Sequence, residues 1–216
     1  MPHVHVYAVS YDLGFAPNPF GGVCSLACCK PEIRRTAQLD DWVVGLTSTK
    51  LPPALRLVFA MRVSRISDFD EYWSSAEFAG RKAARNGSQK AQVGDNIYHR
   101  DRPETDWIQE DSVHSLPGGL QCDLNRDHDT RVNRILLSDH FLYLGDQARA
   151  VPNEILVELK YWKNPRDRRK FTMEEAADLI GWIEGLKAAA AASVVGDPID
   201  FDKTGKTFSY VGQKMI

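Results

Sequence analysis

The pattern of hydrophobic and polar residues predicts several β-strands, and it is clearest near the N-terminus, where the two kinds alternate with the period of two that is typical of strands. Residues 4–10 combine this alternation with β-branched and aromatic side chains and predict a first strand. Residues 40–48 and 54–66 predict two more strands, separated by a turn that contains two prolines. Residues 133–145 are strongly strand-like as well. About six strands with only short helices between them favour an α+β fold over a doubly wound sheet, and we expect a barrel-like domain.

Helical patterns are shorter, except near the C-terminus. Pro31 stands where a helix can begin, and Ser67 is a suitable N-cap for a second short helix. The clearest helix is predicted over residues 172–192, with a threonine cap, acidic residues in the first turn and apolar residues at helical spacing. The tail that follows could add a terminal hairpin or pack as an extended arm. Because the pattern changes near residue 151, we expect a domain over residues 1–152 and a helical extension over residues 153–216 that packs on it.

Composition and charge argue against several classes of protein. The 216 residues are 43% hydrophobic and 26% charged, as in ordinary globular proteins. The formal net charge of −2 gives no chain-wide basic footprint for nucleic acid, although residues 160–170 form a local basic candidate. No apolar run approaches the roughly 20 residues that span a bilayer, and the N-terminus does not have the pattern of a signal peptide. We therefore expect a cytoplasmic protein with reduced cysteines.

Three cysteines fall within six residues, at positions 24, 28 and 29, and Cys122 lies far along the chain. This spacing lacks the paired two-residue motif of a strong zinc site, and no metal is expected, although His114 or His128 could complete four ligands. A nucleophilic thiol would need a base such as His99 or His114 nearby in the fold. Because free cysteine is among the most buried residue types, inert packing is the favoured reading of all of them.

The same region, residues 14–35, could instead bind an anion. Its glycines and prolines shape a loop that can open backbone amides, with Asn18 inside it and Lys30 and Arg34 after it. The segment lacks the GxxxxGK[ST] pattern of a phosphate-binding Walker loop. Structural use of the glycines is the alternative.

A second polar constellation occupies residues 94–115. In strand register His99 shares a face with Asp101, and His114 shares one with Glu110 and Ser112. Imidazoles and carboxylates on one face of a hairpin suit acid–base chemistry or recognition of a base edge; an exposed polar ribbon is the alternative. The candidate catalytic residues are His99, Asp101, Asp111 and His114. The candidate ligand-binding residues are Asn18, Lys30, Arg34, Asn96, Ser138, Asp139 and two stacking aromatics, Trp42 and Trp107.

The ordered motifs "YDLGFAPNPFGGVCSLACCKPEIRRTAQLDDWVVGLTS", "LVFAMRVSRISDFDEYW", "GDNIYHRD", "WIQEDSVHS" and "LLSDHFLYLGDQA" resemble the nucleotide modification associated domain family, type 2. Its members are prokaryotic and phage proteins linked to DNA or nucleotide modification. The resemblance covers residues 4–152 and does not clearly include residues 160–216. The strings around residues 40–66 are also similar to PUA-like domains, with Asp40 in place of an expected glycine. That similarity implies a PUA-like barrel with an aromatic, polar-rimmed pocket for a modified base.

These observations give three functional hypotheses. The first is a protein that binds a nucleotide or modified nucleobase in a prokaryotic or phage DNA-modification or defence system. The second is a nucleotide-modifying hydrolase or group transferase, with Asp111 and His114 as acid–base residues and Cys28 or Asp101 as partners. The third is an interaction module that uses the C-terminal helix, which could also form a homodimer. The sequence does not specify a cofactor.

Overall fold

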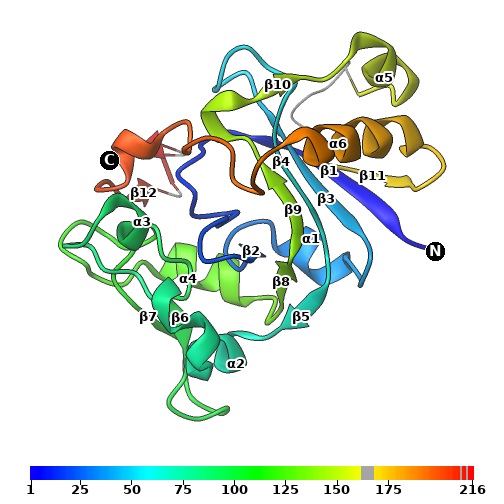
Figure 1. The fold of residues 1–216 in the computed structure, drawn as a ribbon. Coiled ribbons are helices and arrows are strands. Elements are labelled where there is room, and N and C mark those ends of the chain that lie inside the picture. Colours follow the sequence, from blue (N-terminus) through cyan, green and yellow to red (C-terminus); the bar gives the residue numbers. More distant parts are fainter. Residues whose placement is uncertain (162–167, 210, 213) are drawn as a thin grey trace. The chain divides into compact units, whose positions relative to one another are not determined.

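The fold was analysed in a computed structural model, which describes residues 1–161, 168–209, 211–212 and 214–216. These residues pack as two compact units, each built from separate stretches of chain (Figure 1). The first unit contains residues 1–12, 37–65 and 138–199, and the second contains residues 13–36, 66–137 and 200–216. The segment 153–216, expected as one extension, is therefore divided between the two. Part of the basic candidate, residues 162–167, lies outside the described residues.

The first unit is organised around a mixed β-sheet. Its strands follow the order β10-β4-β3-β1-β11, and β9 also pairs with β4. The pairing of β1 with β3 is parallel, and the other pairings are antiparallel. The strands are β1 His3–Val9, β3 Trp42–Thr47, β4 Arg56–Arg62, β9 His140–Tyr143, β10 Arg149–Ala150 and β11 Arg169–Thr172.

Two helices and a 3₁₀ turn complete this unit: η2 Gly145–Gln147, α5 Asn153–Glu158 and α6 Ala177–Ala189. Helix α6 places Leu179, Ile180 and Ile183 in the core formed by the strands. Its apolar side is thus used within the unit. The helix is shorter than the 172–192 expected, because residues 169–172 form β11 and Thr172 caps a turn, with its Oγ1 accepting from the Glu175 amide at 3.1 Å.

The second unit consists of short elements joined by long loops. It contains a three-stranded sheet in the order β2-β8-β5, the hairpin β6–β7 and the C-terminal hairpin β12–β13. The strands are β2 Cys24–Leu26, β5 Arg65–Ser67, β6 Tyr98–His99, β7 Ile108–Gln109, β8 Ile135–Ser138, β12 Phe208–Ser209 and β13 Lys214–Met215. The helices are α1 Pro31–Thr36, α2 Phe69–Ser74, η1 Ala76–Arg81, α3 Gln89–Gln92, α4 Asp123–Thr130 and η3 Phe201–Lys203.

The observed architecture is α+β, as predicted. None of the sheets among the described residues closes on itself, and the PUA-like barrel is not confirmed. The strand expected over residues 133–145 is two strands, β8 and β9, which separate at Asp139. The Ser138 hydroxyl donates to the carbonyls of Arg62 and His140 there, which fixes the break. The terminal hairpin is confirmed.

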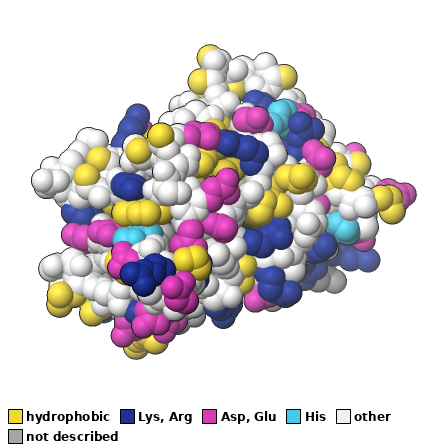
Figure 2. Space-filling view, turned by 90° about the horizontal axis from the view of Figure 1, so that it is seen from below, with side chains coloured by type: hydrophobic (Ala, Val, Ile, Leu, Met, Phe, Trp, Pro, Cys, Tyr) yellow, Lys and Arg dark blue, Asp and Glu magenta, His cyan; other side chains and the backbone are white. Residues whose placement is uncertain are grey.

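Two surface properties bear on function. On the face drawn in Figure 2, Lys and Arg side chains are interspersed with Asp and Glu, in keeping with the net charge of −2. Within the part of the chain that the structure describes, no helix combines the length and the apolar character needed to cross a membrane.

Candidate active site

Cys29 occupies a strained turn between strand β2 and helix α1. Its φ is 59° and that of Lys30 is 41°, a left-handed conformation that non-glycine residues seldom adopt. The turn is held by two hydrogen bonds: the Cys29 amide donates to Asp129 Oδ1 at 2.7 Å, and Arg34 Nε donates to the Cys29 carbonyl at 2.9 Å. Cys29 is partly exposed at this turn, whereas Cys24 and Cys28 are fully buried.

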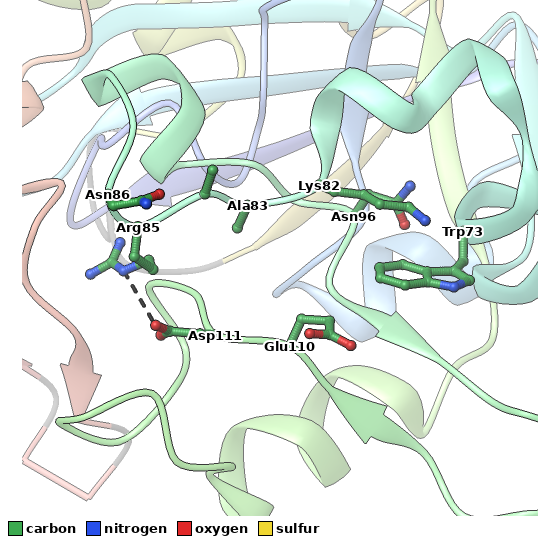
Figure 3. A pocket seen from close by; sticks show the side chains of 9 residues that line it. Trp73, Lys82, Ala83, Arg85, Asn86, Asn96, Glu110 and Asp111 are labelled. Carbon is green, nitrogen blue, oxygen red and sulfur yellow. Dashed lines mark ion pairs between the residues drawn. The ribbon is translucent and has the colours of Figure 1, made fainter.

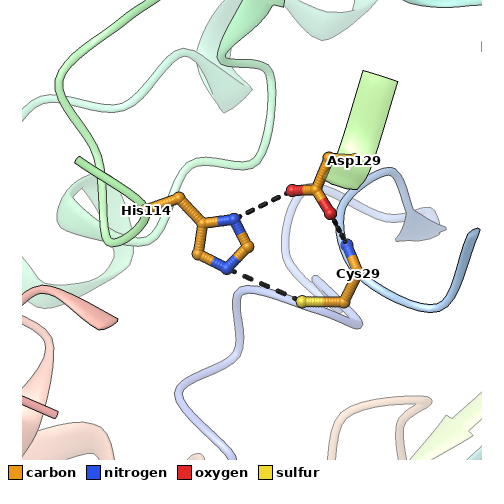
Figure 4. Close-up of side chains that lie close together, drawn as sticks. All are labelled: Cys29, His114 and Asp129. Carbon is orange, nitrogen blue, oxygen red and sulfur yellow. Dashed lines mark hydrogen bonds and ion pairs between the residues drawn. The ribbon is translucent and has the colours of Figure 1, made fainter. Parts of the chain in front are cut away.

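The Cys29 sulfur faces an imidazole that is in turn held by a carboxylate (Figure 4). The distance from Cys29 Sγ to His114 Nε2 is 3.6 Å, and His114 Nδ1 lies 2.8 Å from Asp129 Oδ2. The three residues are 85 and 15 positions apart along the chain, and all belong to the second unit. A nucleophile, a base and a group that orients the base are the parts of a catalytic triad.

The imidazole is fixed by contacts on several sides. Asn125 Nδ2 donates to the His114 carbonyl at 2.8 Å, and Phe15 packs edge-on against the ring with centroids 4.7 Å apart. Asn125 and Asp129 are buried and lie four residues apart on one face of α4. This face therefore holds both the backbone carbonyl and the ring of His114. Tyr98 donates its hydroxyl to Asp129 Oδ2 at 3.0 Å. The side chains are therefore preorganised.

The charges in this cluster reinforce one another. Burial would lower the pKa of His114, but the adjacent Cys29 and Asp129 outweigh it and raise this pKa to about 10. Burial would also raise the pKa of Asp129, but the His114 cation, hydrogen bonds from His114 and His128, and Arg34 hold it well below its ordinary value. The pair is thus an imidazolium and a carboxylate at neutral pH.

The charged His114–Asp129 pair predicts a pH-dependent contribution to stability. A pKa raised from 6.5 to about 10 in the folded state stabilises the fold fully below pH 6.5, and this contribution is lost as the pH rises to about 10. We expect the stability advantage of the wild type over His114→Gln to shrink between pH 6.5 and 9.5, by at most about 1.4 kcal/mol per pH unit. Urea unfolding at several pH values measures it. An advantage that stays constant or grows would contradict the charged pair.

The same three side chains could also be considered as metal ligands, because their ligand atoms lie within 4.8 Å of one another. The geometry fits a triad better. Cys29 faces Nε2 of the ring, whereas Asp129 faces Nδ1, on the other side. An ion bound to Nε2 beside the sulfur would not meet the Asp129 carboxylate, which would act only as an outer-shell partner.

The other predicted catalytic residues lie apart from this triad. His99 pairs with Glu110 at 2.8 Å between Nε2 and Oε1, and Asp111 lies 3.9 Å from Arg85. Asp101 is an exposed residue in the loop after β6. Residues 94–115 do contain a hairpin, β6–β7, but it is only two residues long on each side, so His114 lies beyond it in a loop.

The residues expected to bind phosphate have structural contacts. Arg34 is fully buried and donates to four backbone carbonyls, those of Cys29, Asp129, Val132 and Arg134. Its guanidinium is therefore occupied by contacts within the protein. Asn18 is also buried: its Nδ2 donates to the Val93 carbonyl at 3.0 Å, and its Oδ1 accepts from the Phe20 amide. Lys30 directly follows Cys29, and burial lowers its pKa.

The remaining candidates are divided between the units. Trp42, Ser138 and Asp139 belong to the first unit, where Trp42 is buried and packs edge-on against His140. Trp107 belongs to the second unit and lies beneath the Arg100 guanidinium, 4.2 Å from the ring centroid. Asn96, also in the second unit, lines a pocket together with Asp111.

Two members of the triad, Cys29 and Asp129, were not among the predicted site residues. The dense cysteine segment favoured packing, which is correct for Cys24 and Cys28. For Asp129 a signal was present in the sequence: α4 is almost wholly polar, and Asn125 and Asp129 at spacing four mark one face of it.

Comparison with known proteins places the chain in a family. A family model described as nucleotide modification associated domain 2 matches residues 1–205 of 216. The match extends well beyond residue 152 and includes most of the C-terminal region. Comparison with curated proteins gave no match, and comparison with solved structures gave none. The family match covers nearly the whole chain, Cys29, His114 and Asp129 included, and the protein belongs to the nucleotide modification associated domain 2 family.

Proposed function

We propose that this protein is a thiol-dependent enzyme of nucleotide modification, a hydrolase or group transferase with Cys29 as its nucleophile. The observation that carries the proposal is the relay from Cys29 Sγ through the His114 ring to Asp129, with distances of 3.6 and 2.8 Å. Distances of this size are typical of nucleophile–base pairs before substrate binds. The family association with nucleotide modification supports the substrate class.

In the proposed reaction His114 holds the proton that leaves the Cys29 thiol. The sulfur then attacks an electrophilic carbon of the substrate, so that an S–C bond forms while the bond to the leaving group breaks. His114 Nε2 donates its proton to that leaving group. Water or a second acceptor, deprotonated by His114, then breaks the S–C bond and restores the thiol.

Asp129 has two positioning roles in this scheme. Its Oδ2 holds His114 Nδ1, which keeps Nε2 directed at the sulfur. Its Oδ1 accepts from the Cys29 amide, which holds the strained turn that carries the nucleophile. One buried carboxylate thus fixes both the base and the nucleophile relative to each other.

Binding of a nucleotide or modified base without chemistry is the second candidate function. A polar pocket in the same unit, lined by Trp73 and Asn96 among others, favours it. A role in prokaryotic or phage DNA modification fits both functions, as does a reducing cytoplasm, which would keep Cys29 a free thiol. Neither function depends on a PUA-like barrel or on a homodimer through α6.

The test is capture of the covalent intermediate. The protein is incubated with a panel of standard and modified nucleosides and oligonucleotides, and its intact mass is measured. We expect an adduct on Cys29 with at least one member of the panel, and none with Cys29→Ala. An adduct or turnover that survives Cys29→Ala would overturn the assignment of the nucleophile, while binding with no chemistry in the wild type would favour the second candidate.

A further inference from the structure

A pocket of about 560 Å³ lies in the second unit beside the hairpin β6–β7 (Figure 3). Its volume is within the range of small-molecule sites, about 300–1,000 Å³. In the view of Figure 3, Trp73, Lys82 and Asn96 lie toward one end of the pocket and Arg85 with Asp111 toward the other. The lining residues are Trp73, Lys82, Ala83, Ala84, Arg85, Asn86, Asn96, Glu110 and Asp111.

Asn96 contributes an acceptor that none of the described residues uses. Its Nδ2 donates to the carbonyls of Tyr72 and Phe78 at 2.8 and 3.2 Å. Exchange of the amide nitrogen and oxygen would place the amide oxygen against these two carbonyl oxygens, so the two bonds fix the orientation of the amide. Asn96 is 1% exposed, and no described residue hydrogen-bonds its Oδ1. A buried acceptor without a partner is costly, and an N–H group of a ligand would satisfy it.

Trp73 supplies a flat surface at the pocket. One face of its indole stacks on His99, with ring centroids 4.0 Å apart and planes at 9°. The Lys82 ammonium lies 3.5 Å from the indole centroid. Two groups this close to one centroid cannot share a face, so Lys82 covers the face opposite His99. A flexible lysine can leave that face to a planar ligand and still donate a hydrogen bond to its edge.

The charges of the lining are balanced. Lys82 and Arg85 oppose Glu110 and Asp111, and Arg85 is fixed by the carbonyls of Gln92, Thr204 and Lys206. A lining of this kind does not select for a strongly anionic group such as a polyphosphate. It suits an uncharged planar group that presents both donors and acceptors.

We propose that this pocket binds the base of an adenine or cytosine nucleotide and recognises its amino group; the inference rests on the proposed function for its nucleotide substrate. Asn96 Oδ1 accepts from the exocyclic amino group, and Lys82 donates to the ring nitrogen beside it. Adenine and cytosine share this donor–acceptor edge, whereas hypoxanthine and uracil present the reverse order. The base stacks on the indole of Trp73.

The chain connects the pocket to the triad. Asp111, in the lining, and His114 are three residues apart, so their Cα atoms lie at most about 11 Å from each other. A base in this pocket would therefore bring an attached sugar, or a substituent of the ring, toward the loop that carries His114.

The test compares ligands that differ only in the recognised edge. Isothermal titration calorimetry measures the dissociation constants of adenosine and inosine, and of cytidine and uridine. The same comparison is then made with single-stranded oligonucleotides that contain each base. We expect the amino-bearing member of a pair to bind at least about tenfold more tightly, since the other leaves Asn96 Oδ1 unsatisfied. A preference among nucleosides identifies a free nucleoside as the ligand, and a preference among oligonucleotides alone identifies a base within a strand.

Variants assign the preference to this pocket. Trp73→Leu should weaken binding about tenfold, since stacking on it is lost, while the matched control Trp107→Leu, outside the lining, should not. Equal binding within both pairs, no binding, or full binding by Trp73→Leu would overturn the inference. Cys29→Ala should bind normally, because Cys29 is outside the lining. If the wild type shows the amino-group preference but forms no adduct on Cys29, only the proposed function is overturned.

Discussion

Iodoacetamide is expected to alkylate Cys29 at least about a thousand times faster than Cys24 or Cys28 in the folded protein. Cys29 is partly exposed and lies beside the imidazolium of His114, the environment in which thiols react fastest. Cys24 and Cys28 are 0% exposed, and burial raises the pKa of both thiols. They react only when the protein opens, and an opened fraction of about 10⁻³ or less sets the ratio.

The measurement is a time course of alkylation followed by mass spectrometry. All three cysteines fall in one tryptic peptide, because no Lys or Arg precedes Lys30 in the sequence, so fragment ions must assign the modified residue. The control is His114→Ala, which should slow the alkylation of Cys29 about tenfold or more by removing its cationic partner. Equal reaction at Cys28 and Cys29 would show that Cys29 has no special reactivity.

Only part of the site could be predicted from the sequence, because the residues of the site that contact one another lie far apart along the chain. His114 was identified because imidazole and carboxylate groups alternate around it in a polar segment. Its partners were not, because Cys29 and Asp129 lie 85 and 15 positions away and meet it only through the tertiary fold. Cysteine burial is also only a statistical preference. The left-handed backbone at Cys29 and Lys30 distinguishes the partly exposed Cys29 from the buried Cys28, and the sequence does not show it.

The fold shows the same division between local and non-local information. The strands of the first unit were predicted where six or seven residues carry a strand pattern, as an alternation in β1 and as an apolar run in β3 and β4. The second unit has strands of two to four residues, too short for a periodic pattern, and its shape depends on side-chain bonds to loops. Arg34 illustrates the difficulty: beside a glycine-rich loop it resembled a phosphate ligand, and only the fold shows that its partners are carbonyls about 100 residues away.

Arg34→Ala is expected to lower the free energy of unfolding by about 3–5 kcal/mol. Arg34 is fully buried, and its guanidinium donates to four backbone carbonyls from two stretches of the second unit. Alanine would leave these acceptors unsatisfied and remove the cation that lies near Asp129. Arg34→Lys keeps the charge but not the planar fork of donors, so we expect it to be destabilised as well, by a smaller amount.

The neighbouring Arg35 is a matched control. Its side chain is 59% exposed and pairs with Glu32 on the surface of α1, so Arg35→Ala should change stability by less than about 0.5 kcal/mol. Urea unfolding compares the three variants with the wild type.

Arg34 also connects stability to chemistry, because two of its four carbonyls belong to Cys29 and Asp129. In a folded Arg34→Lys protein, iodoacetamide should therefore alkylate Cys29 more slowly than in the wild type. In Arg35→Ala, the rate of alkylation should equal that of the wild type. If Arg34→Lys were destabilised yet alkylated at the wild-type rate, Arg34 would support the fold without positioning the nucleophile. If Arg34→Ala were as stable as Arg35→Ala, the inference that the hydrogen bonds from Arg34 to the four carbonyls stabilise the fold would be wrong.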